Sequence, residues 1–285
     1  MVQFFQEVLL MDIRCIVLDM DMTTLGTDKK ISNANREALE YVISKGIHVA
    51  IASGRPFSTL PQDVVSIPGM EYAITSNGAA LYHIPSGTRM LHHTLEPQSV
   101  ERLVAVLQNL PYACETFIDS KGYSQADFFA DPTRFGAPDY TVKYIRRTRT
   151  PVADMPAFML EHKDHLDSVS IITDTHSIQN HLYPLLQEAL PECYLTCSAE
   201  HMLEIAHRNC GKHHAVRFLA DYLHLTPEQI AAFGDGDNDA EMLSFAGQGI
   251  AVANASPACL AAADHVTVHF SQSAIAHGIH EILRL

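Results

Sequence analysis

The stretch CIVLDMDMTTLGTDKK, residues 15–30, is an apolar run that stops abruptly at two aspartates, Asp19 and Asp21. Residues 13–19 predict a strand buried on both faces, because they form a short, continuous, β-branched apolar run with polar residues at its end. A carboxylate at the end of such a strand is costly to bury unless a partner compensates for its charge. The pair therefore marks a place where chemistry is expected.

Strands and helices alternate along the chain that follows this run. Residues 33–46 have apolar positions at helical spacing, and Gly46 is placed as the C-terminal cap of that helix. Residues 47–53 and 72–78 indicate two more buried strands. This β-α-β-α-β order predicts an α/β fold with a doubly wound, mostly parallel sheet and helices on both faces.

The pattern changes after this first unit and returns near residue 200. Residues 79–95 predict a hairpin, and the strands that follow alternate as if one face were wet. Residues 230–235 form another buried strand that ends in an aspartate. We therefore predict one α/β core interrupted by an inserted α+β domain, with the core at 1–82 and 200–285 and the insertion at 83–199.

Composition describes an ordinary globular chain and excludes some classes of partner. Of 285 residues, 47% are hydrophobic and 18% are charged, and the formal net charge is −14. This charge argues against a nucleic-acid binder, which needs a basic surface to meet phosphates. No stretch reaches the roughly 18 uninterrupted apolar residues of a membrane span. We expect no obligate protein partner, since nothing in the sequence indicates one.

The termini and cysteines indicate a cytoplasmic protein. The first ten residues lack the basic start and small-residue cleavage site of a signal peptide. Met11 is an alternative to Met1 as the start, because the first strand follows it directly. Six scattered cysteines without knuckle spacing predict reduced thiols rather than a zinc site.

Polar residues gather where the parallel strands are predicted to end, and ligands bind at that edge of an open α/β sheet. They are Asp19 with Asp21, SGR at 53–55, Asn77 with Gly78, and GDGDND at 234–239, with Lys212 at the start of a helix. Carboxylates this close share protons or hold a cation. Oxygen ligands with an incomplete protein shell favour Mg²⁺ over Ca²⁺.

An EF-hand loop is the alternative for residues 235–246, because its first positions have the right spacing. It fails at the sixth position, Ala240, where glycine is needed, and at the twelfth, Ala246, where a bidentate glutamate is needed. Mg²⁺, a carboxylate, a hydroxyl and a lysine instead suit phosphoryl transfer, in which a carboxylate can form an aspartyl-phosphate.

In this order, DMDMTTL, SGR, Lys212 and GDGDNDAEML resemble motifs I to IV of the haloacid dehalogenase (HAD) superfamily. The insertion between TSNGA and Lys212 resembles the cap of its Cof-like phosphatases, on a Rossmann-like core. The resemblance covers nearly the whole chain. It implies a Mg²⁺-dependent phosphatase that acts on a small phosphorylated metabolite, such as a sugar phosphate, a nucleotide or a phosphorylated cofactor.

The resemblance also implies a role for each motif residue. Asp19 is the nucleophile and a metal ligand, and Asp21 is the acid/base whose backbone carbonyl also binds the metal. Lys212 holds the phosphoryl group, and Asp235 and Asp239 complete the metal site. The phosphate-binding set is Ser53, Gly54, Met22 and Asn238, and Arg55 and Asn77 are candidates on the substrate side.

The sequence departs from the family at Met22, where motif I usually has glycine. Our hypothesis is that the loop keeps a backbone conformation open to any L-residue, so that the Met22 N–H still points at the phosphoryl oxygens.

Two other functions stay open: a phosphomutase of the same architecture, and a non-catalytic sensor of a phosphorylated ligand. A receiver domain is disfavoured because it has no inserted domain.

Overall fold

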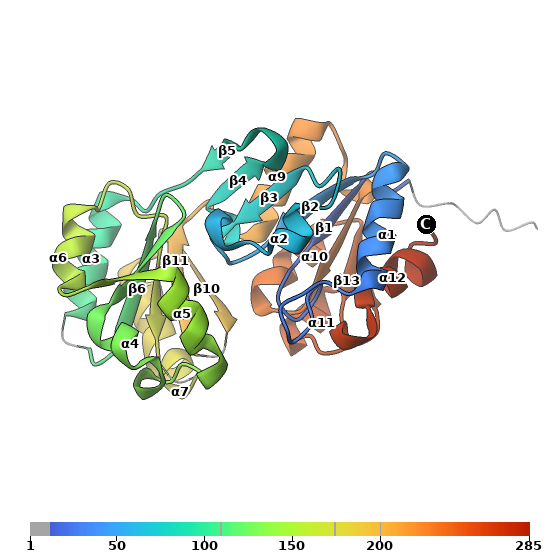
Figure 1. Ribbon diagram of the computed structural model, residues 1–285. Coiled ribbons are helices and arrows are strands. Elements are labelled where there is room, and N and C mark those ends of the chain that lie inside the picture. Colours follow the sequence, from blue (N-terminus) through green and yellow to red (C-terminus); the bar gives the residue numbers. More distant parts are fainter. Residues whose placement is uncertain (1–11, 109, 174, 200) are drawn as a thin grey trace, which may run out of the picture.

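The computed structural model describes residues 12–108, 110–173, 175–199 and 201–285 (Figure 1). The alternative starts at Met1 and Met11 lie outside these described residues. The described chain forms two sheets of different character. The first has eight strands in the order β14 (His265–Val266), β13 (Gln248–Ala251), β12 (Ile230–Gly234), β1 (Cys15–Leu18), β2 (His48–Ala52), β3 (Tyr72–Thr75), β4 (Ala80–His83) and β5 (Thr88–His92).

The predicted parallel sheet is confirmed. β1 lies in its middle and pairs in parallel with β2 on one side and β12 on the other. Among the pairings described for this sheet, two are antiparallel, β3 with β4 and β4 with β5, so β4 alone runs against the other strands. Because β1 and β12 are neighbours, the residues that follow Leu18 and Gly234 meet at one edge of the sheet.

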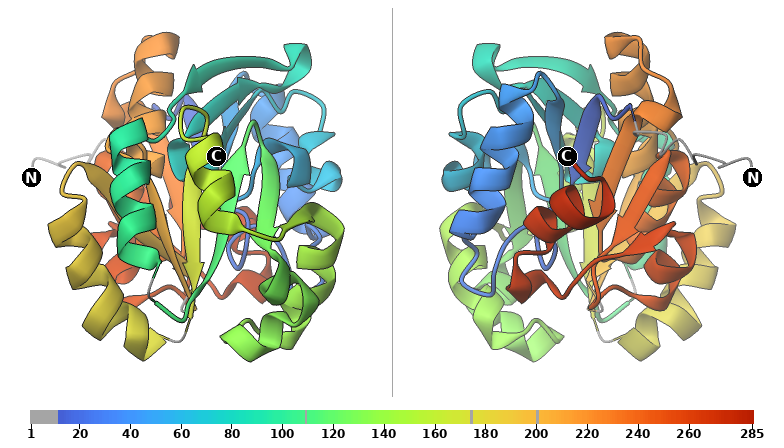
Figure 2. Two further views of the ribbon diagram at one scale, coloured as in Figure 1. Left: turned by 90° about the vertical axis from the view of Figure 1, so that its left-hand side faces the viewer. Right: turned by 90° about the vertical axis from the view of Figure 1, so that its right-hand side faces the viewer.

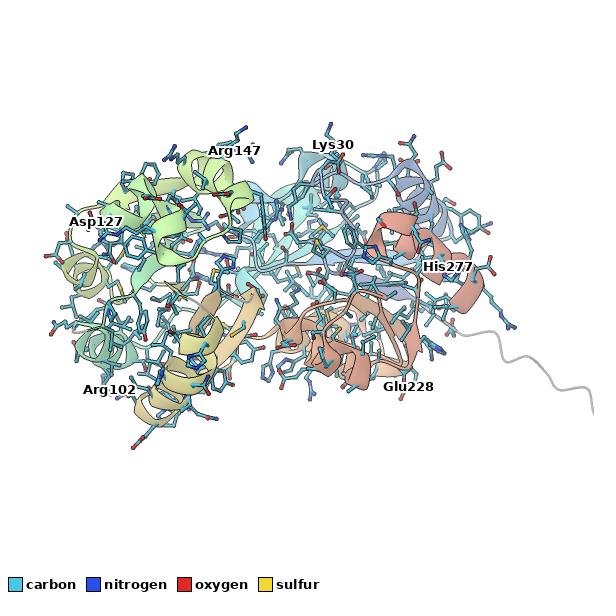
Figure 3. All side chains as sticks on the ribbon, turned by 90° about the horizontal axis from the view of Figure 1, so that it is seen from below. Lys30, Arg102, Asp127, Arg147, Glu228 and His277 are labelled. Carbon is cyan, nitrogen blue, oxygen red and sulfur yellow. The ribbon has the colours of Figure 1, made fainter. Side chains whose placement is uncertain are left out.

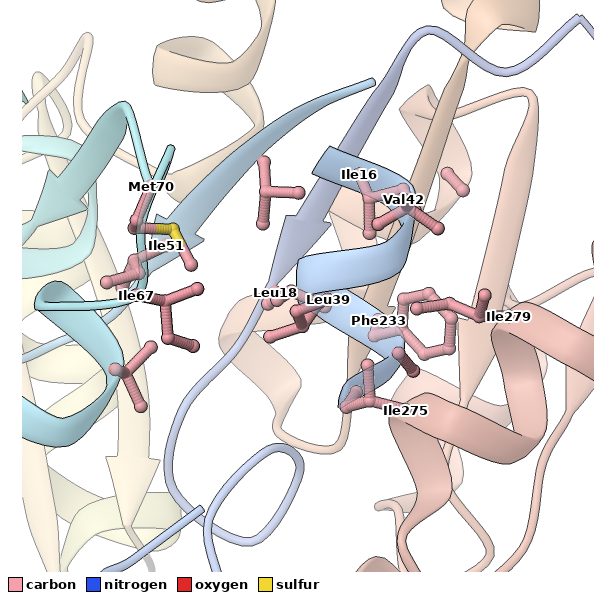
Figure 4. Close-up of a cluster of buried hydrophobic side chains, with 14 of the residues drawn as sticks. Ile16, Leu18, Leu39, Val42, Ile51, Ile67, Met70, Phe233, Ile275 and Ile279 are labelled. Carbon is pink, nitrogen blue, oxygen red and sulfur yellow. The ribbon is translucent and has the colours of Figure 1, made fainter. Parts of the chain in front are cut away.

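Helices cover both faces of this sheet, as the burial of all four residues of β1 requires. Ile16 and Leu18 pack against α1 (Asn33–Ser44), whose Leu39 and Val42 point at the sheet, and against Ile275 of α12 (Ala274–His277) (Figure 4). Cys15 and Val17 face the opposite side. There they meet α9 (Lys212–Leu223), α10 (Ala240–Phe245) and α11 (Pro257–Ala262).

Helix α1 begins and ends where its sequence predicts. The Ser32 side chain accepts a hydrogen bond from the Asn35 N–H, which caps the first turn. Gly46 follows the helix with φ +81°, a left-handed conformation that glycine adopts without steric cost. The chain then turns directly into β2.

The second sheet has six strands among the described residues and is almost entirely antiparallel. Its order is β10 (Cys193–Ala199), β11 (Met202–His207), β9 (Ser168–Ile172), β6 (Ala113–Ile118), β7 (Lys121–Gln125) and β8 (Arg149–Val152). One face is covered by α3 (Pro97–Leu107), α6 (Met155–Glu161) and α8 (Tyr183–Ala189), which lie on the side away from the first sheet (Figures 1 and 2).

The surface of this second part is charged on its outer helices. Arg102 of α3 and Asp127 of α4 (Ala126–Ala130) are exposed and project outward (Figure 3). A fifth helix, α5 (Val142–Thr148), lies with α4 near the other face of the sheet. These short helices cover only part of that face, so some of it is left to contact the first sheet.

The chain changes sheets after His92 and after His207, and this differs from the predicted boundaries at 82/83 and 199/200. The boundary at 83 is displaced because β5 follows β4 through a tight hairpin and pairs with it in the first sheet. The boundary at 199 is displaced because β11 pairs with both β10 and β9 in the second sheet. Among the described residues, no helix is both long enough and apolar enough to cross a membrane.

Candidate active site

Asp19 lies directly after β1 and is only 6% exposed. Its N–H donates to the carbonyl of Phe233 in β12 over 3.0 Å, so the parallel ladder continues to this residue and fixes its place. Its carboxylate oxygen Oδ1 accepts a hydrogen bond from Lys212 Nζ at 2.6 Å. The predicted nucleophile therefore lies at the end of the central strand with a cation already against it.

Lys212 links two of the predicted site carboxylates. It is the first residue of α9, is 1% exposed, and its Nζ donates to Asp19 Oδ1 and to Asp239 Oδ1, each at 2.6 Å. Burial alone lowers the pKa of Lys212, but the two carboxylates outweigh it and raise that pKa above its usual range. The lysine therefore stays charged and supplies fixed positive charge at the sheet edge.

Three carboxylates form a group that fits a cation. Asp19, Asp235 and Asp239 each offer one oxygen, and these oxygens all lie within 4.8 Å of one another. Burial, reinforced by the neighbouring carboxyls, raises the pKa of Asp235 to about 6 and that of Asp19 well above its usual range. A divalent ion with hard-oxygen preference would relieve this repulsion, and Mg²⁺ fits such a donor set.

The side chain of Asp239 holds the turn after β12 that carries Asp235. The Asp239 oxygen Oδ2 accepts hydrogen bonds from the N–H groups of Asp235 and Gly236 at 3.0 and 2.9 Å. A Cβ on Gly234 would lie 2.5 Å from the Asp239 side chain, so only glycine fits where β12 ends. Asp239 thus orients Lys212 and holds the turn that presents Asp235.

Asn77 joins the site loops to one another. Ser76 and Asn77 have φ angles of 48° and 51°, and the Asn77 Oδ1 accepts a hydrogen bond from Asn238 Nδ2 at 2.9 Å. Its backbone carbonyl accepts from the Gly211 N–H at 2.7 Å, and its N–H donates to the Ser53 carbonyl at 3.1 Å. The predicted grouping of these strand ends is therefore present in the structure.

The SGR segment, residues 53–55, lies at the site, but its predicted role in phosphate binding is not tested by its position. Ser53 is 2% exposed, and its Oγ accepts from the Arg55 N–H at 3.1 Å. A Cβ on Gly54 would lie 3.2 Å from the Asn77 amide oxygen, so this glycine allows the two loops to approach. The roles of Ser53, Gly54 and Asn238 in phosphate binding stay predictions.

Asp21 lies apart from the three-carboxylate group, because its side chain is paired with two cations. Arg55 donates from Nε to Asp21 Oδ2 at 2.7 Å and from Nη2 to Oδ1 at 2.6 Å, and Lys29 donates to Oδ1 at 2.8 Å. Burial alone raises the pKa of Asp21, but these cations outweigh it and lower it to about 2. The metal ligand that the resemblance implies is the Asp21 backbone carbonyl, which stays a prediction.

Met22 does not have the backbone conformation that we expected. Its φ is +63°, a left-handed conformation that favours glycine, so the hypothesis of a loop open to any L-residue is wrong. The loop is held by Asn254, whose Nδ2 donates to the Met22 carbonyl at 3.0 Å. The side chain is 39% exposed. Methionine thus occupies a glycine conformation without a buried side chain to compensate.

Two threonines and a glutamate were not among the predicted site residues. The Thr23 Oγ1 donates to Asp235 Oδ1 at 2.7 Å, and the Thr24 Oγ1 donates to the Asp19 carbonyl at 2.5 Å. Glu204 of β11 is buried, and the Asn77 side chain is one of its hydrogen-bond partners. A lone glutamate in the apolar run MLEIA was the available signal for the last of these.

These motifs on this fold define a class of enzyme. The family model of haloacid dehalogenase-like hydrolases matches residues 16–279, so the chain belongs to that family. The cap-bearing Cof-like resemblance is supported by the relatives and by the structures that share the fold. The chain is thus an enzyme of the hydrolase class.

Two curated relatives and one solved structure illustrate the match. An HMP-PP phosphatase of Cronobacter sakazakii is 30% identical over 91% of this chain and 92% of its own length. The 5-amino-6-(5-phospho-D-ribitylamino)uracil phosphatase YitU of Bacillus subtilis is 26% identical over 95% of this chain and 97% of its own. A haloacid dehalogenase-like hydrolase from Bacteroides thetaiotaomicron shares the fold with a TM-score of 0.77 and 24% identity, over 95% and 99% of the two chains.

Proposed function

We propose that this chain is a Mg²⁺-dependent phosphatase that hydrolyses a small phosphorylated metabolite through an aspartyl-phosphate. The family and its relatives support a phosphoric monoester hydrolase. The observation that carries the finer proposal is the buried contact of Asp19 with Lys212 beside Asp235 and Asp239. A carboxylate, a fixed cation and a cation site lie together there, as phosphoryl transfer needs.

The proposed reaction has two steps that use this chain's own residues. An oxygen of Asp19 attacks phosphorus, the bond from phosphorus to the ester oxygen breaks, and Asp21 gives its proton to the leaving oxygen. Asp21 then takes a proton from water, which attacks phosphorus and releases phosphate and free Asp19. A bound Mg²⁺ supplies positive charge for the phosphoryl oxygens. Asp19, Asp235, Asp239 and the Asp21 carbonyl would hold it.

The Asp21 ion pair adds a requirement to this mechanism. With its pKa lowered to about 2, the carboxyl carries no proton at neutral pH while Arg55 and Lys29 hold it. Substrate must therefore draw at least one of these cations away before Asp21 acts as an acid. The phosphate group is the natural competitor, because Arg55 binds a phosphate in the same bidentate way as a carboxylate.

The proposal also covers the cellular location of the protein and its partners. We place the protein in the cytoplasm, in keeping with its six free cysteines, and we assign it no nucleic-acid or obligate protein partner. A phosphomutase of the same architecture and a phospho-ligand sensor are the rival functions. The mutase would return the phosphoryl group to a sugar hydroxyl, and the sensor would bind without turnover.

The test is a screen of phosphorylated metabolites for phosphate release with Mg²⁺ and with EDTA. We expect release that needs Mg²⁺ and is lost in Asp19→Asn, whereas the exposed Asp127→Asn on α4 behaves as wild type. Phosphoryl exchange between sugar hydroxyls without release would favour the mutase. Tight binding of phosphate esters with no turnover of any would favour the sensor.

A further inference from the structure

A row of polar side chains crosses the second sheet on one face. The strand register sets its members directly opposite one another on neighbouring strands, and residues so paired point to the same side of a sheet. All are buried. This polar row consists, from β10 to β7, of Thr196, Glu204, Ser170, Glu115 and Ser124.

The face that carries the polar row is turned toward the first sheet. Tyr194 and Ala206 lie opposite each other two residues further along β10 and β11, and so on the same face. Both pack against Ala79, which follows β3 in the first part of the chain. The other face is covered by α3, α6 and α8, on the side away from the first sheet (Figure 2).

The polar row begins beside the site. Glu204 shares a hydrogen bond with the Asn77 side chain, and Asn77 accepts from Asn238, the neighbour of Asp239. Lys212 is close enough to act on the charge of Glu204. The polar row therefore starts next to the phosphoryl-transfer site and continues across the face of the second sheet that is turned toward the first sheet. The leaving part of a substrate would lie against this face.

The two glutamates of the polar row differ, because Glu115 has an ion pair and Glu204 has only hydrogen bonds. Glu115 accepts two hydrogen bonds from Arg149 and one from Ser124 at 3.0 to 3.1 Å. Glu204 is 8% exposed, accepts from the Ser198 N–H at 3.2 Å, and has no ion pair with a basic side chain of the described residues. Burial raises the pKa of Glu204 above its usual value.

Ser170 lies between the two glutamates and lacks a partner. It is 1% exposed, and its Oγ is one of two buried side-chain polar atoms in the described chain without a hydrogen-bond partner. A buried hydroxyl without a hydrogen-bond partner destabilises the fold, and a buried carboxylate without a cation does so more strongly. The Ser170 hydroxyl and the Glu204 carboxyl lie side by side, and a ligand that donates hydrogen bonds would supply a partner to both.

We propose that Glu204 and Ser170 bind an amino group on the leaving part of the substrate. This inference rests on the proposed function, since it assigns the substrate class of the same site. An amine supplies several N–H donors and, when protonated, the cation that Glu204 lacks. Glu204 is the charged partner, Ser170 accepts a second hydrogen bond, and the Glu115–Arg149 pair fixes the far side.

The experiment compares pairs of phosphate esters that differ only in an amine and a hydroxyl. Suitable probes are glucosamine 6-phosphate with glucose 6-phosphate, and pyridoxamine 5′-phosphate with pyridoxine 5′-phosphate. The quantity measured is the ratio of kcat/KM for the amine over the hydroxyl partner. Glu204→Gln keeps the side-chain volume and removes the charge, and Ser170→Ala removes the hydroxyl. Glu188→Gln changes an exposed glutamate on α8 and is the matched control.

We expect wild type and Glu188→Gln to prefer the amine in at least one pair by about tenfold or more. Glu204→Gln should lose that preference, and Ser170→Ala should reduce it several-fold. Equal ratios in wild type and Glu204→Gln, or a preference for the hydroxyl partner in every pair, would overturn the proposal. Ser170→Ala is the smaller change and decides the matter if Glu204→Gln does not fold.

Failure of the proposed function gives a different pattern. A folded protein that hydrolyses neither these esters nor p-nitrophenyl phosphate with Mg²⁺ is no phosphatase of small esters. Thermal shifts with the same pairs then decide whether Glu204 and Ser170 bind an amine. Tighter binding of the amine member by wild type but not by Glu204→Gln supports the site, and equal binding of both members contradicts it.

Discussion

At the scale of single residues, Met22 departs from the family pattern, and its backbone conformation destabilises the fold. A non-glycine residue in a left-handed conformation costs about 1–2 kcal/mol. Its φ of +63° and its half-exposed side chain indicate that the protein accepts this cost without gaining a buried contact. Strain of this kind is common beside functional sites.

Met22→Gly should therefore raise the free energy of unfolding. The relief of strain exceeds the entropy that glycine loses on folding, about 0.5–1 kcal/mol, so we expect a net gain of up to about 1 kcal/mol. Met22→Ala keeps the strain and is the control for loss of the side chain. Denaturant unfolding measures all three proteins. A glycine variant no more stable than the alanine variant would show that Met22 carries no strain.

Arg55 is predicted to set the charge state of Asp21. The pKa of that carboxyl is lowered to about 2 because Arg55 and Lys29 outweigh the effect of burial. Arg55→Met should therefore raise the Asp21 pKa by at least one unit, which a carboxyl NMR titration measures. The stability that the pair contributes is complete above pH about 4 and is lost as the pH falls toward 2. An unchanged Asp21 pKa in Arg55→Met would mean that Lys29 alone holds the carboxylate.

At the scale of elements, the site depends on how closely two loops approach. Gly78 has φ +90°, and a Cβ there would lie 2.3 Å from the carbonyl oxygen of Gly211, directly before Lys212. Gly87 also has a left-handed φ, +66°, but has nothing within 4 Å of its Cβ position. An alanine at Gly87 would therefore add backbone strain alone, whereas an alanine at Gly78 would add both backbone strain and a steric clash.

Gly78→Ala should destabilise the fold by more than 2 kcal/mol, because the loop that orients Lys212 must move. Gly87→Ala should cost only about 1–2 kcal/mol, the cost of a left-handed alanine. Thermal or denaturant unfolding measures both changes. Similar losses in the two variants would mean that the contact between residues 78 and 211 has no special weight.

The sequence predicted the elements that have a clear apolar pattern. Strand β1 is visible as a short continuous apolar run, and helix α1 is visible because its apolar residues recur at helical spacing. The Met22 conformation was not visible, because φ depends on how the loop is anchored, here by Asn254 from the far end of the chain. The sheet change after His92 was missed because a hairpin in either sheet has the same local pattern.

The same limit applies to the site. Asp19, Lys212 and Asp235 were predicted because each follows a strand or starts a helix, and parallel topology brings those points together. The pairing of Asp21 with Arg55 was not predicted, since each residue was expected to act on the substrate. The polar row was invisible for a further reason: it is spread over five strands and exists only through their register.

At the scale of the whole molecule, the acidic site should couple folding to metal and pH. The folded-state pKa of Asp235 is about 6, above the ordinary value of 3.8. The metal-free fold therefore loses stability from this group as the pH rises from about 4 to about 6. Mg²⁺ binds the ionised form, so its stabilising effect should grow over the same range.

The rise in melting temperature caused by Mg²⁺, relative to EDTA, should thus be larger at pH 7 than at pH 5. Below the Asp235 pKa the ion displaces a proton, which weakens binding by up to about tenfold per pH unit. Ca²⁺ should also stabilise the fold but inhibit turnover, because it tolerates more ligands and a less fixed geometry. An equal shift at both pH values, or one reproduced by sodium chloride of the same ionic strength, would contradict this coupling.

The central claim is that Asp19 becomes phosphorylated, and Asp21→Asn with p-nitrophenyl phosphate tests it most directly. The p-nitrophenolate leaves without needing a proton, whereas the second step still lacks its base, so the intermediate should accumulate. Mass spectrometry of the acid-quenched protein should then find one phosphoryl group on the peptide that contains Asp19, and none in Asp19→Asn or with EDTA. Turnover of p-nitrophenyl phosphate by Asp19→Asn at the wild-type rate, or a phosphoryl group found on another residue, would contradict the account.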